Sequence, residues 1–458
     1  MVRSDGIAAH SYFVSSRGEA AVIDPRRDVG IYVSLSLRTG SEIRYIFETH
    51  RNEDLVTGSL ELKHVFPSAE ICHSRETDFK YGDHRLSDGD QFQIGDTDIS
   101  CIWTPGHTDD SMCYLFGDSP SPQDAVALFT GDTLFVDGVG RTDLVDPAKA
   151  GLMADKLYDS LRRILDLPDG TLVYPGHGAG SVCGGGISDR EVSTIGFERT
   201  HNRWLMLDRE TFIRQKESER LTLAPYFKHC ERLNTVGPPL LSQLGPVSVL
   251  DGHTVAKFAQ EAGHVIVDVR PHEQFIWGHI PGSVSLPLGN LGLIAGWVLR
   301  PEERFILIPD ATESFGAARA RLVRLGLDGV IGVLPGGVDA WKLAGHRLDS
   351  LKAYSATELK SLVGSGAIQV ADNREEHELA GGQIEGSRSV PLTRLVESMS
   401  RLDSGRPVAT VCPSGARSTA AASMMRRLGL DDVGVLVGGL KGWIQMGYPL
   451  RGSAIQKE

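Results

Sequence analysis

The second half of the chain repeats one sequence pattern at an offset of about 103 residues. Asp268 with Arg270 recurs as Asp372 with Arg374, and a pair of glycines precedes a Trp in both copies. Each copy alternates short apolar strands with helical stretches, which is typical of a small α/β domain with a parallel sheet. The repeat therefore predicts two similar α/β domains in this half of the chain.

The first half follows a different pattern, in which apolar strands end in short polar turns. Four such turns carry His50, His107, Asp132 and His177. These four ends span about 130 residues, and we expect them to converge because their strands lie side by side, with function at one edge of a sheet. A chain of 458 residues is too long for one core. We expect domains at 1–238, 247–350 and 351–458, with a proline-containing linker between the first two.

Three side chains in these turns predict a metal site. His50, His107 and Asp132 lie within the motifs Thr-His, Thr-Pro-Gly-His and Thr-Gly-Asp. Two imidazoles and one carboxylate form a facial triad, which leaves about three open positions on an octahedral ion. This arrangement suits non-haem Fe(II) that reacts with O2.

The turns resemble the metallo-β-lactamase superfamily, in particular its glyoxalase-II and persulfide dioxygenase branches. That family usually has His-x-His-x-Asp-His in the first turn, whereas this chain keeps His50 and Asp54 but has Asn52 and Leu55 at the other two positions. A dinuclear zinc hydrolase needs all of these ligands. The departure therefore favours the persulfide dioxygenase branch, for which the resemblance implies an αββα sandwich and one Fe(II), with zinc as the alternative ion.

The resemblance also implies roles for residues around the metal. Asp54, His177 and Asn52 are expected close to it, where they orient ligands, substrate or water. Arg141 lies in a Gly-Arg-Thr-Asp segment that resembles the family segment contacting the thiol carrier, which is usually glutathione. Glutathione, coenzyme A, bacillithiol and cysteine persulfides all remain open as the substrate.

Residues 411–418, with the sequence Val-Cys-Pro-Ser-Gly-Ala-Arg-Ser, resemble the active loop of rhodaneses. Ser414 and Gly415 are small, so backbone N–H groups can point at the sulfur of Cys412. Together with Arg417 and the start of a helix expected over 419–428, they would stabilise a thiolate or persulfide. Phosphatases use Cys-x5-Arg, but only four residues separate Cys412 from Arg417 here, which favours transfer of sulfane sulfur to sulfite.

The first copy of the repeat lacks this loop. Alignment of the two copies places Pro309 opposite Cys412 and Ser314 opposite Arg417. The neighbouring Asp310 would repel an anion. The sequence therefore predicts a rhodanese-like domain without activity, kept for spacing or docking.

The domain order resembles bacterial fusions of persulfide dioxygenase with rhodanese. That resemblance implies a homo-oligomer that oxidises a persulfide to sulfite with O2 and forms thiosulfate at Cys412. Two alternatives stay open. One is a zinc-dependent thioester hydrolase of the glyoxalase-II type, and the other is a sulfur carrier or persulfide sensor without catalysis.

Charge and hydropathy indicate the setting in which the protein acts. The net charge of −12 disfavours nucleic acid and anionic membranes as partners. The N-terminal residues lack the apolar run of a signal peptide, and no segment reaches the roughly 18 apolar residues of a membrane span. The six cysteines form no Cys-x-x-Cys pair. We therefore expect a cytoplasmic protein in a reducing compartment.

Overall fold

The computed structural model describes residues 1–4, 6–181, 183–184, 186–219 and 221–452. It divides into two compact units, Met1–Leu244 with Val323–Gly326 and Gly245–Leu322 with Leu327–Glu458. None of the helices in the described ranges is long and apolar enough to cross a membrane.

The first unit contains two six-stranded sheets. The strands of the first sheet follow chain order: β1 (Val2–Ser4), β2 (Ala9–Ser16), β3 (Glu19–Ile23), β4 (Glu42–Phe47), β5 (Glu70–Ser74) and β6 (His84–Leu86). The second sheet has the order β14 (Ser193–Thr194), β13 (Leu172–Pro175), β10 (Ala125–Gly131), β9 (Met112–Gly117), β8 (Thr97–Trp103) and β7 (Gln91–Ile94). A short hairpin follows β10 and consists of β11 (Leu134–Phe135) and β12 (Gly138–Val139).

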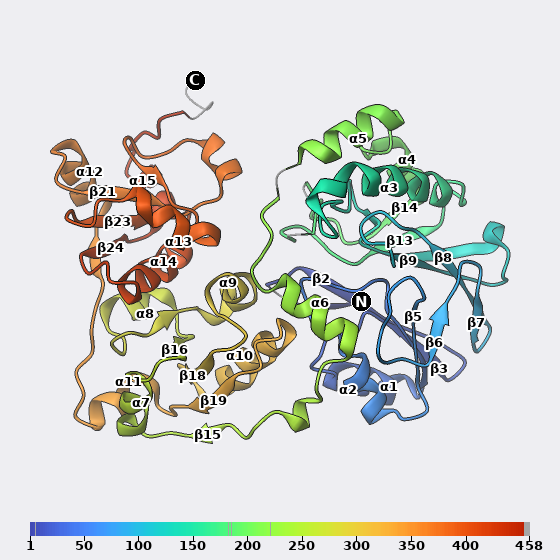
Figure 1. Ribbon diagram of the computed structural model, residues 1–458, viewed down its shortest axis with the longest axis horizontal. Coiled ribbons are helices and arrows are strands. Elements are labelled where there is room, and N and C mark those ends of the chain that lie inside the picture. Colours follow the sequence, from blue (N-terminus) through green and yellow to red (C-terminus); the bar gives the residue numbers. More distant parts are fainter. Residues whose placement is uncertain (5, 182, 185, 220, 453–458) are drawn as a thin grey trace. The chain divides into compact units, whose positions relative to one another are not determined.

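Helices cover the outer faces of both sheets (Figure 1). The first sheet packs against α1 (Gly30–Thr39) and α2 (Ser59–Val65). The second packs against α3 (Ala150–Ile164), α4 (Ile195–His201) and α5 (Arg209–Ser218). A further helix, α6 (Phe227–Val236), follows them in the chain.

Strand alternation explains why this unit has three apolar layers. In β9, Cys113 and Leu115 face the helix layer, whereas Tyr114 and Phe116 lie in the core between the sheets. In β4, Ile43 packs with the helices on the other side. Both faces of each sheet are therefore buried, and the αββα sandwich predicted from the sequence is confirmed.

The strands that carry the polar turns come from both sheets. Strands β10 and β13 are parallel neighbours in the second sheet, which also contains β8, but β4 belongs to the first sheet. The expectation that all four strands lie side by side in one sheet was therefore wrong. Alternation shows that a strand has two buried faces but does not show to which sheet it belongs. The four polar ends meet because the two sheets face each other.

The second unit contains two five-stranded parallel sheets with the same topology. The first has the order β15 (Ser248–Val249), β19 (Val330–Val333), β18 (Arg304–Ile308), β16 (His264–Asp268) and β17 (Val284–Ser285). Its helices are α7 (Gly252–Phe258), α8 (His272–Trp277), α9 (Leu291–Val298), α10 (Thr312–Arg324) and α11 (Gly337–Leu343).

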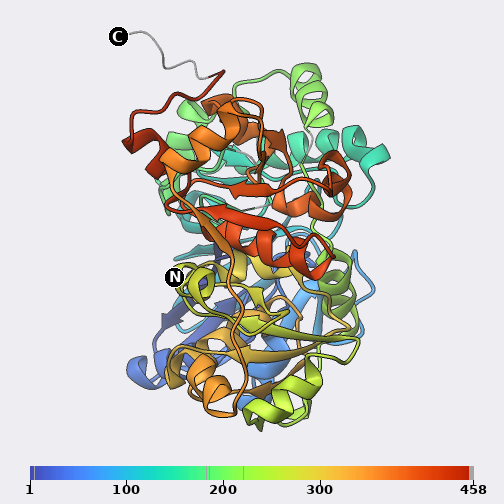
Figure 2. The ribbon, with the colours of Figure 1, turned by 90° about the vertical axis from the view of Figure 1, so that its left-hand side faces the viewer.

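The second sheet repeats this order as β20 (Lys352–Tyr354), β24 (Val433–Leu436), β23 (Val408–Val411), β21 (Gln369–Asp372) and β22 (Arg388–Ser389). Its helices are α12 (Ala356–Gly364), α13 (Leu395–Ser398), α14 (Ala416–Arg427) and α15 (Gly439–Gln445). In Figure 2 its strands, in orange and red, form one layer between helices of the same colours. The predicted pair of α/β domains with parallel sheets is therefore confirmed.

The repeated Asp and Arg have the same structural role in both copies. Arg270 forms a buried ion pair with Asp268, and Arg374 forms the equivalent pair with Asp372. Each guanidinium also donates to the carbonyl of a glycine eight residues further along, at 2.8 Å in both copies. The pair therefore fixes the segment after β16 or β21 to the end of that strand, which explains why the sequence repeats it.

Candidate metal centre and sulfurtransfer loop

Glycines allow the turns of the first unit to approach one another closely. Gly131, with a φ of +48°, ends β10, and a Cβ there would lie 2.5 Å from the hydroxyl of Thr49. Gly106, with a φ of +144°, precedes His107, and a Cβ there would lie 2.4 Å from the Cα of Leu157 in α3. Any other residue would separate the turns, so these two glycines bring the polar strand ends together.

His50 is held in one orientation by a chain of hydrogen bonds. The hydroxyl of Thr49 donates to Asp24 Oδ2 at 2.8 Å and lies 2.9 Å from His50 Nδ1. When Asp24 is ionised, it accepts the hydroxyl proton of Thr49, and Nδ1 is then the donor to Thr49. This leaves the lone pair on His50 Nε2, which has no hydrogen-bond partner among the described residues.

His107 is oriented in the same way by a backbone carbonyl. Its Nδ1 lies 3.0 Å from the carbonyl oxygen of Arg141, which can only accept, so Nδ1 carries the proton. In the neutral imidazole, Nε2 is the acceptor, and like His50 Nε2 it has no hydrogen-bond partner within the described part of the chain. Burial acts to lower the pKa of His107, but Glu53 and Asp132 raise it, so a metal ion would displace a proton from Nε2. The rings of His50 and His107 are nearly perpendicular, with centroids 5.0 Å apart. Both imidazoles therefore present a lone pair to the same small space.

Asp132 is positioned by His177. One oxygen, Oδ1, lies 2.7 Å from His177 Nδ1, and the other ring nitrogen of His177 lies 2.8 Å from Asp54 Oδ2. Burial alone would lower the pKa of His177, but the two carboxylates raise it well above its ordinary value. His177 is therefore a cation between two anions. Asp132 Oδ2 remains unpartnered in the described residues and lies 3.5 Å from His107 Nε2.

Glu53 lies in the same space and was missed by the sequence analysis. Its side chain is only 1% exposed, and Oε2 has no hydrogen-bond partner among the described residues. Oε1 lies 3.5 Å from His107 Nε2 and accepts from the thiol of Cys183 at 3.3 Å. Burial acts to raise the pKa of Glu53, but the His107 imidazole outweighs it and brings the value to about 2. The carboxylate is therefore ionised in this protein.

The donor atoms of this space fit a divalent cation. Unpartnered buried atoms of His50, Glu53, His107 and Asp132 face one another, and His50, Glu53 and His107 form one group of ligand atoms within 4.8 Å. Burial lowers the pKa of His50, so its imidazole is neutral, as a ligand must be. His50 and His107 thus meet with Glu53, while Asp132 lies 3.5 Å from His107 and groups with Glu53 and Cys183.

Asn52 does not point into the centre. Its amide nitrogen donates to the His50 carbonyl at 3.4 Å. Asn234 of α6 donates to the carbonyls of Asn52 and Leu55, both at 2.7 Å, and so fixes this turn from a distant part of the chain. The turn therefore presents Glu53 to the centre, one position after the residue that aligns with the family's second His.

Arg141 is placed differently from the expectation for a substrate-binding residue. Its side chain is buried and forms a bidentate ion pair with Asp143, at 2.7 and 2.9 Å, and it also donates to the carbonyl of Leu221 at 3.1 Å. A contact with a thiol carrier would need this side chain to leave those partners. Its contribution to the centre in this structure is the carbonyl that orients His107.

In the second unit, backbone N–H groups surround the sulfur of Cys412. The N–H groups of Gly415 and Ser418 donate to its Sγ at 3.1 and 3.4 Å. Helix α14 begins at Ala416, three residues earlier than the expected helix, so its N-terminus adjoins the sulfur. Ser414 is exposed. Arg417 forms a bidentate ion pair with Glu378, at 2.6 and 2.7 Å. Burial acts to lower the pKa of Arg417, but Glu378 and, to a smaller extent, Cys412 raise it.

The copy without the cysteine contacts this loop. Gly415 has a φ of +113°, and a Cβ there would lie 2.7 Å from Nε2 of His272, the first residue of α8. Nearby, the backbone N–H of Ser285 donates to Ser423 of α14 at 3.1 Å. The first copy therefore provides part of the surroundings of Cys412. In its own equivalent loop, Ser314 donates to Asp310 instead.

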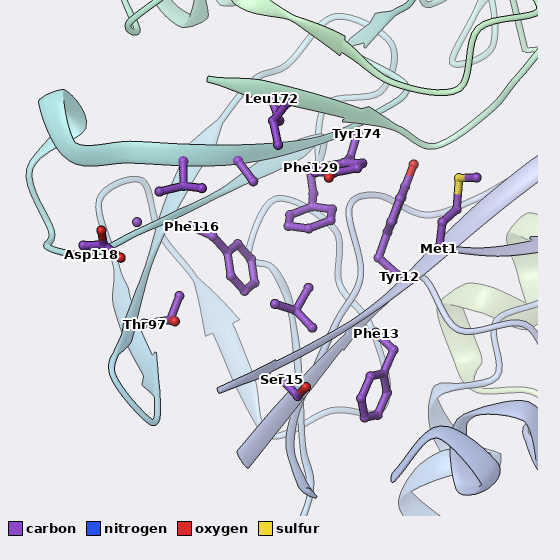
Figure 3. Close-up of a pocket in the computed structure, with 14 residues that line it drawn as sticks. Met1, Tyr12, Phe13, Ser15, Thr97, Phe116, Asp118, Phe129, Leu172 and Tyr174 are labelled. Carbon is purple, nitrogen blue, oxygen red and sulfur yellow. The ribbon is translucent and has the colours of Figure 1, made fainter. Parts of the chain in front are cut away.

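A separate cavity of about 420 Å³ lies between the sheets of the first unit (Figure 3). Aromatic side chains of Tyr12, Phe116, Phe129 and Tyr174 line it. None of the candidate metal-binding residues is among its lining residues. This apolar cavity is therefore distinct from the candidate metal centre.

Comparison with known families gives two matches. The family model described as the metallo-β-lactamase superfamily matches residues 5–177. The model described as a rhodanese-like domain matches twice, at 253–344 and at 355–446. The two matches to the second model correspond to the repeat seen in the sequence.

The proteins similar to the first unit are named for different activities, a hydrolase and a dioxygenase among them. A hydroxyacylglutathione hydrolase of Francisella tularensis subsp. novicida is 31% identical over 174 residues, which are 38% of this chain and 64% of that protein. The mitochondrial persulfide dioxygenase ETHE1 of Bos taurus is 31% identical over 213 residues, which are 45% of this chain and 74% of that protein. A solved metallo-β-lactamase structure from Staphylococcus aureus is 27% identical with a TM-score of 0.65, and the match covers 73% of this chain and 97% of that one.

Proposed function

Because the chain belongs to the metallo-β-lactamase superfamily and carries two rhodanese-like domains, we propose that it is a persulfide dioxygenase coupled to sulfurtransfer. It oxidises the sulfane sulfur of a low-molecular-weight persulfide, such as glutathione persulfide, to sulfite at one Fe(II). Cys412 then carries a second sulfane sulfur to sulfite and forms thiosulfate.

The observation that supports this proposal is that the donor atoms of His50, Glu53 and His107 are free of hydrogen bonds to one another, whereas in the second group of possible ligands, Asp54, His177 and Cys183, two members already bond each other. Leu55 cannot bind a metal, and Asp54 and His177 hold each other at 2.8 Å. A second ion at the Asp54 end would have to break this pair and discharge a buried imidazolium. The arrangement thus favours a mononuclear centre, as a dioxygenase needs, over the dinuclear centre of a hydrolase.

The reaction balances with the partners that are proposed. The persulfide RSSH, O2 and water give RSH, sulfite and two protons, so the sulfane sulfur loses the four electrons that O2 gains. Fe(II) supplies reactivity toward O2, which by itself oxidises closed-shell sulfur compounds only slowly. Thr49 and the Arg141 carbonyl fix the neutral tautomers of His50 and His107, while His177 holds Asp132 ionised.

The loop around Cys412 fits the sulfurtransfer step. The two N–H groups and the start of α14 stabilise a negative charge on Sγ. A thiolate accepts sulfane sulfur as Cys-S-SH, and attack of sulfite on the outer sulfur releases thiosulfate and restores the thiolate. The same atoms that hold the resting sulfur can thus stabilise the leaving thiolate.

The hydrolase alternative rests on the similarity to hydroxyacylglutathione hydrolase. It predicts two zinc ions per chain and cleavage of a hydroxyacylglutathione thioester without O2. The non-catalytic alternative predicts no metal uptake and no turnover, with Cys412 still able to carry sulfur. The four converging donor atoms count against this non-catalytic alternative, because they could bind a metal ion.

One experiment separates the three functions. Wild-type protein and Asp132→Ala are reconstituted with Fe(II) without oxygen, and metal content and O2 uptake with glutathione persulfide are then measured. We expect one iron per wild-type chain and O2 uptake that Asp132→Ala abolishes. Thioester cleavage with two zinc ions and no O2 uptake would replace this proposal with the hydrolase. Cys412→Ser should abolish thiosulfate formation and leave O2 uptake unchanged.

A further inference from the structure

We propose that Glu53 is a ligand of the same ion, so that the centre has two imidazole and two carboxylate ligands. The inference rests on the proposed function only for the presence of a single ion. It assigns to Glu53 the ligand position that the family's second His would fill.

The local backbone explains how a residue at a different position can take this place. Asn52 aligns with the missing His, but its amide donates to the His50 carbonyl and its own carbonyl accepts from Asn234. Because Asn234 also binds the carbonyl of Leu55, the turn is fixed on both sides of Glu53. Glu53 has one more methylene group than Asp, so its carboxylate can extend from this turn to the two imidazoles.

The distances are close to those of a metal centre. Ligands at about 2.0–2.2 Å from an ion lie roughly 2.8–3.6 Å from their neighbours in octahedral or tetrahedral geometry. Glu53 Oε1 lies 3.5 Å from His107 Nε2, and Glu53 Oε2 lies 3.9 Å from His50 Nε2. The Asp132–His107 separation is also 3.5 Å. These separations need to shorten only slightly for all four side chains to bind one ion. Relative to His107, Glu53 is as well placed as the predicted ligand Asp132.

The burial of Glu53 explains why a bound cation is energetically favourable beside it. Glu53 is 1% exposed, its Oε2 is unpartnered in the described residues, and the thiol of Cys183 is a weak donor to Oε1. An ionised carboxylate in such a place costs several kcal/mol unless a cation compensates it. A divalent cation bound by Asp132 and Glu53 would be neutralised by them and would neutralise them in turn.

A second carboxylate ligand changes which metal ions the centre prefers. A hard oxygen ligand in place of an imidazole favours ions such as Fe(II) and Mn(II) more than a third nitrogen ligand would. With Glu53 bound through one oxygen, four protein ligands leave two positions on an octahedral ion. Two positions are enough for one sulfur ligand and one O2.

The test compares Glu53→Gln with Glu48→Gln in the full-length protein. Glu48 is a matched control because its buried carboxylate accepts from Thr57 and Tyr81 and does not face the imidazoles. Dissociation constants for Fe(II) and Co(II) are measured by competition with a chromophoric chelator, and circular dichroism of the metal-free proteins checks folding. Loss of groups that merely orient ligands costs 10–100-fold, so we expect Glu53→Gln to weaken binding more than about 100-fold. Glu48→Gln should change it less than about threefold.

The Co(II) absorption spectrum provides a second readout. Glu53→Asp keeps the charge but shortens the side chain, so we expect retained binding with shifted d–d bands. Unchanged affinity in Glu53→Gln, or unchanged bands in Glu53→Asp, would overturn the inference. A thiolate-to-Co(II) charge-transfer band that disappears in Cys183→Ser would assign the fourth position to Cys183 instead. Glu53-dependent binding without O2 uptake would retain this inference and remove only the proposed dioxygenase function.

Discussion

Thr49 provides a sharp test of how the centre is organised, because its hydroxyl lies between Asp24 and His50. It donates to Asp24 at 2.8 Å and accepts from His50 Nδ1 at 2.9 Å. Thr49→Val keeps the shape of the side chain and its packing against Gly131 but removes both hydrogen bonds. Loss of such an orienting partner weakens metal binding by 10–100-fold, which corresponds to about 1.4–2.7 kcal/mol.

The same change leaves a buried carboxylate oxygen and a buried imidazole N–H unsatisfied. Each unsatisfied group costs about 1–3 kcal/mol, so the metal-free protein should also lose stability. Co(II) titration and urea denaturation measure the two effects. Thr171→Val is the control, since that hydroxyl is also buried but bonds only to the carbonyl of Ala125. If Thr49→Val bound Co(II) as tightly as Thr171→Val, the inferred tautomer of His50 would be wrong.

Three further predictions follow from individual contacts. Burial raises the pKa of Asp24 to about 7, so the folded state keeps a proton that the unfolded chain releases near pH 4. The contribution of Asp24 to stability should therefore be greatest below about pH 4 and fall by on the order of 3 kcal/mol as the pH rises to about 7. Comparison of Asp24→Asn with the wild type by urea denaturation of the metal-free protein should show the loss of this contribution. Asp54→Asn removes one carboxylate from His177 and should weaken Co(II) binding about tenfold, still with one ion per chain. Gly415→Ala would place a methyl group 2.7 Å from His272 Nε2 at a φ of +113°. It should slow thiosulfate formation about 5–30-fold through roughly 1–2 kcal/mol of strain, whereas equal rates would show that the loop adapts without strain.

Sequence periodicity was sufficient for the parts of this protein that consist of repeating local elements. The two parallel α/β domains follow from the repeat and from short apolar strands that alternate with helical stretches, whereas the αββα sandwich was implied by the resemblance of the polar turns to a known superfamily. His50, His107 and Asp132 were predicted as ligands because each lies in the turn after such a strand. Their strands belong to two sheets, so they meet because the sheets face each other, which the strand pattern alone did not show.

The parts that could not be predicted depend on contacts between distant residues. Glu53 faces the centre because Asn234, 182 residues further along, holds the carbonyl of Asn52. Arg141 is buried against Asp143, and Arg417 is paired with Glu378, and neither carboxylate partner could be predicted from the motifs. A motif specifies a residue type near a site, but the partner that fixes its direction comes from elsewhere in the chain.

The contact of His272 with Gly415 has a consequence for how the two rhodanese-like copies have diverged. Because the first copy packs against the Cys412 loop of the second copy, it can lack a cysteine of its own and still be needed for the surroundings of that loop. Mutations at the start of α8 are then constrained by chemistry carried out more than a hundred residues away. Residues 351–458 expressed as a freestanding module would contain the nucleophile but not this wall, so the tandem pair is the smallest piece that preserves the native environment of Cys412.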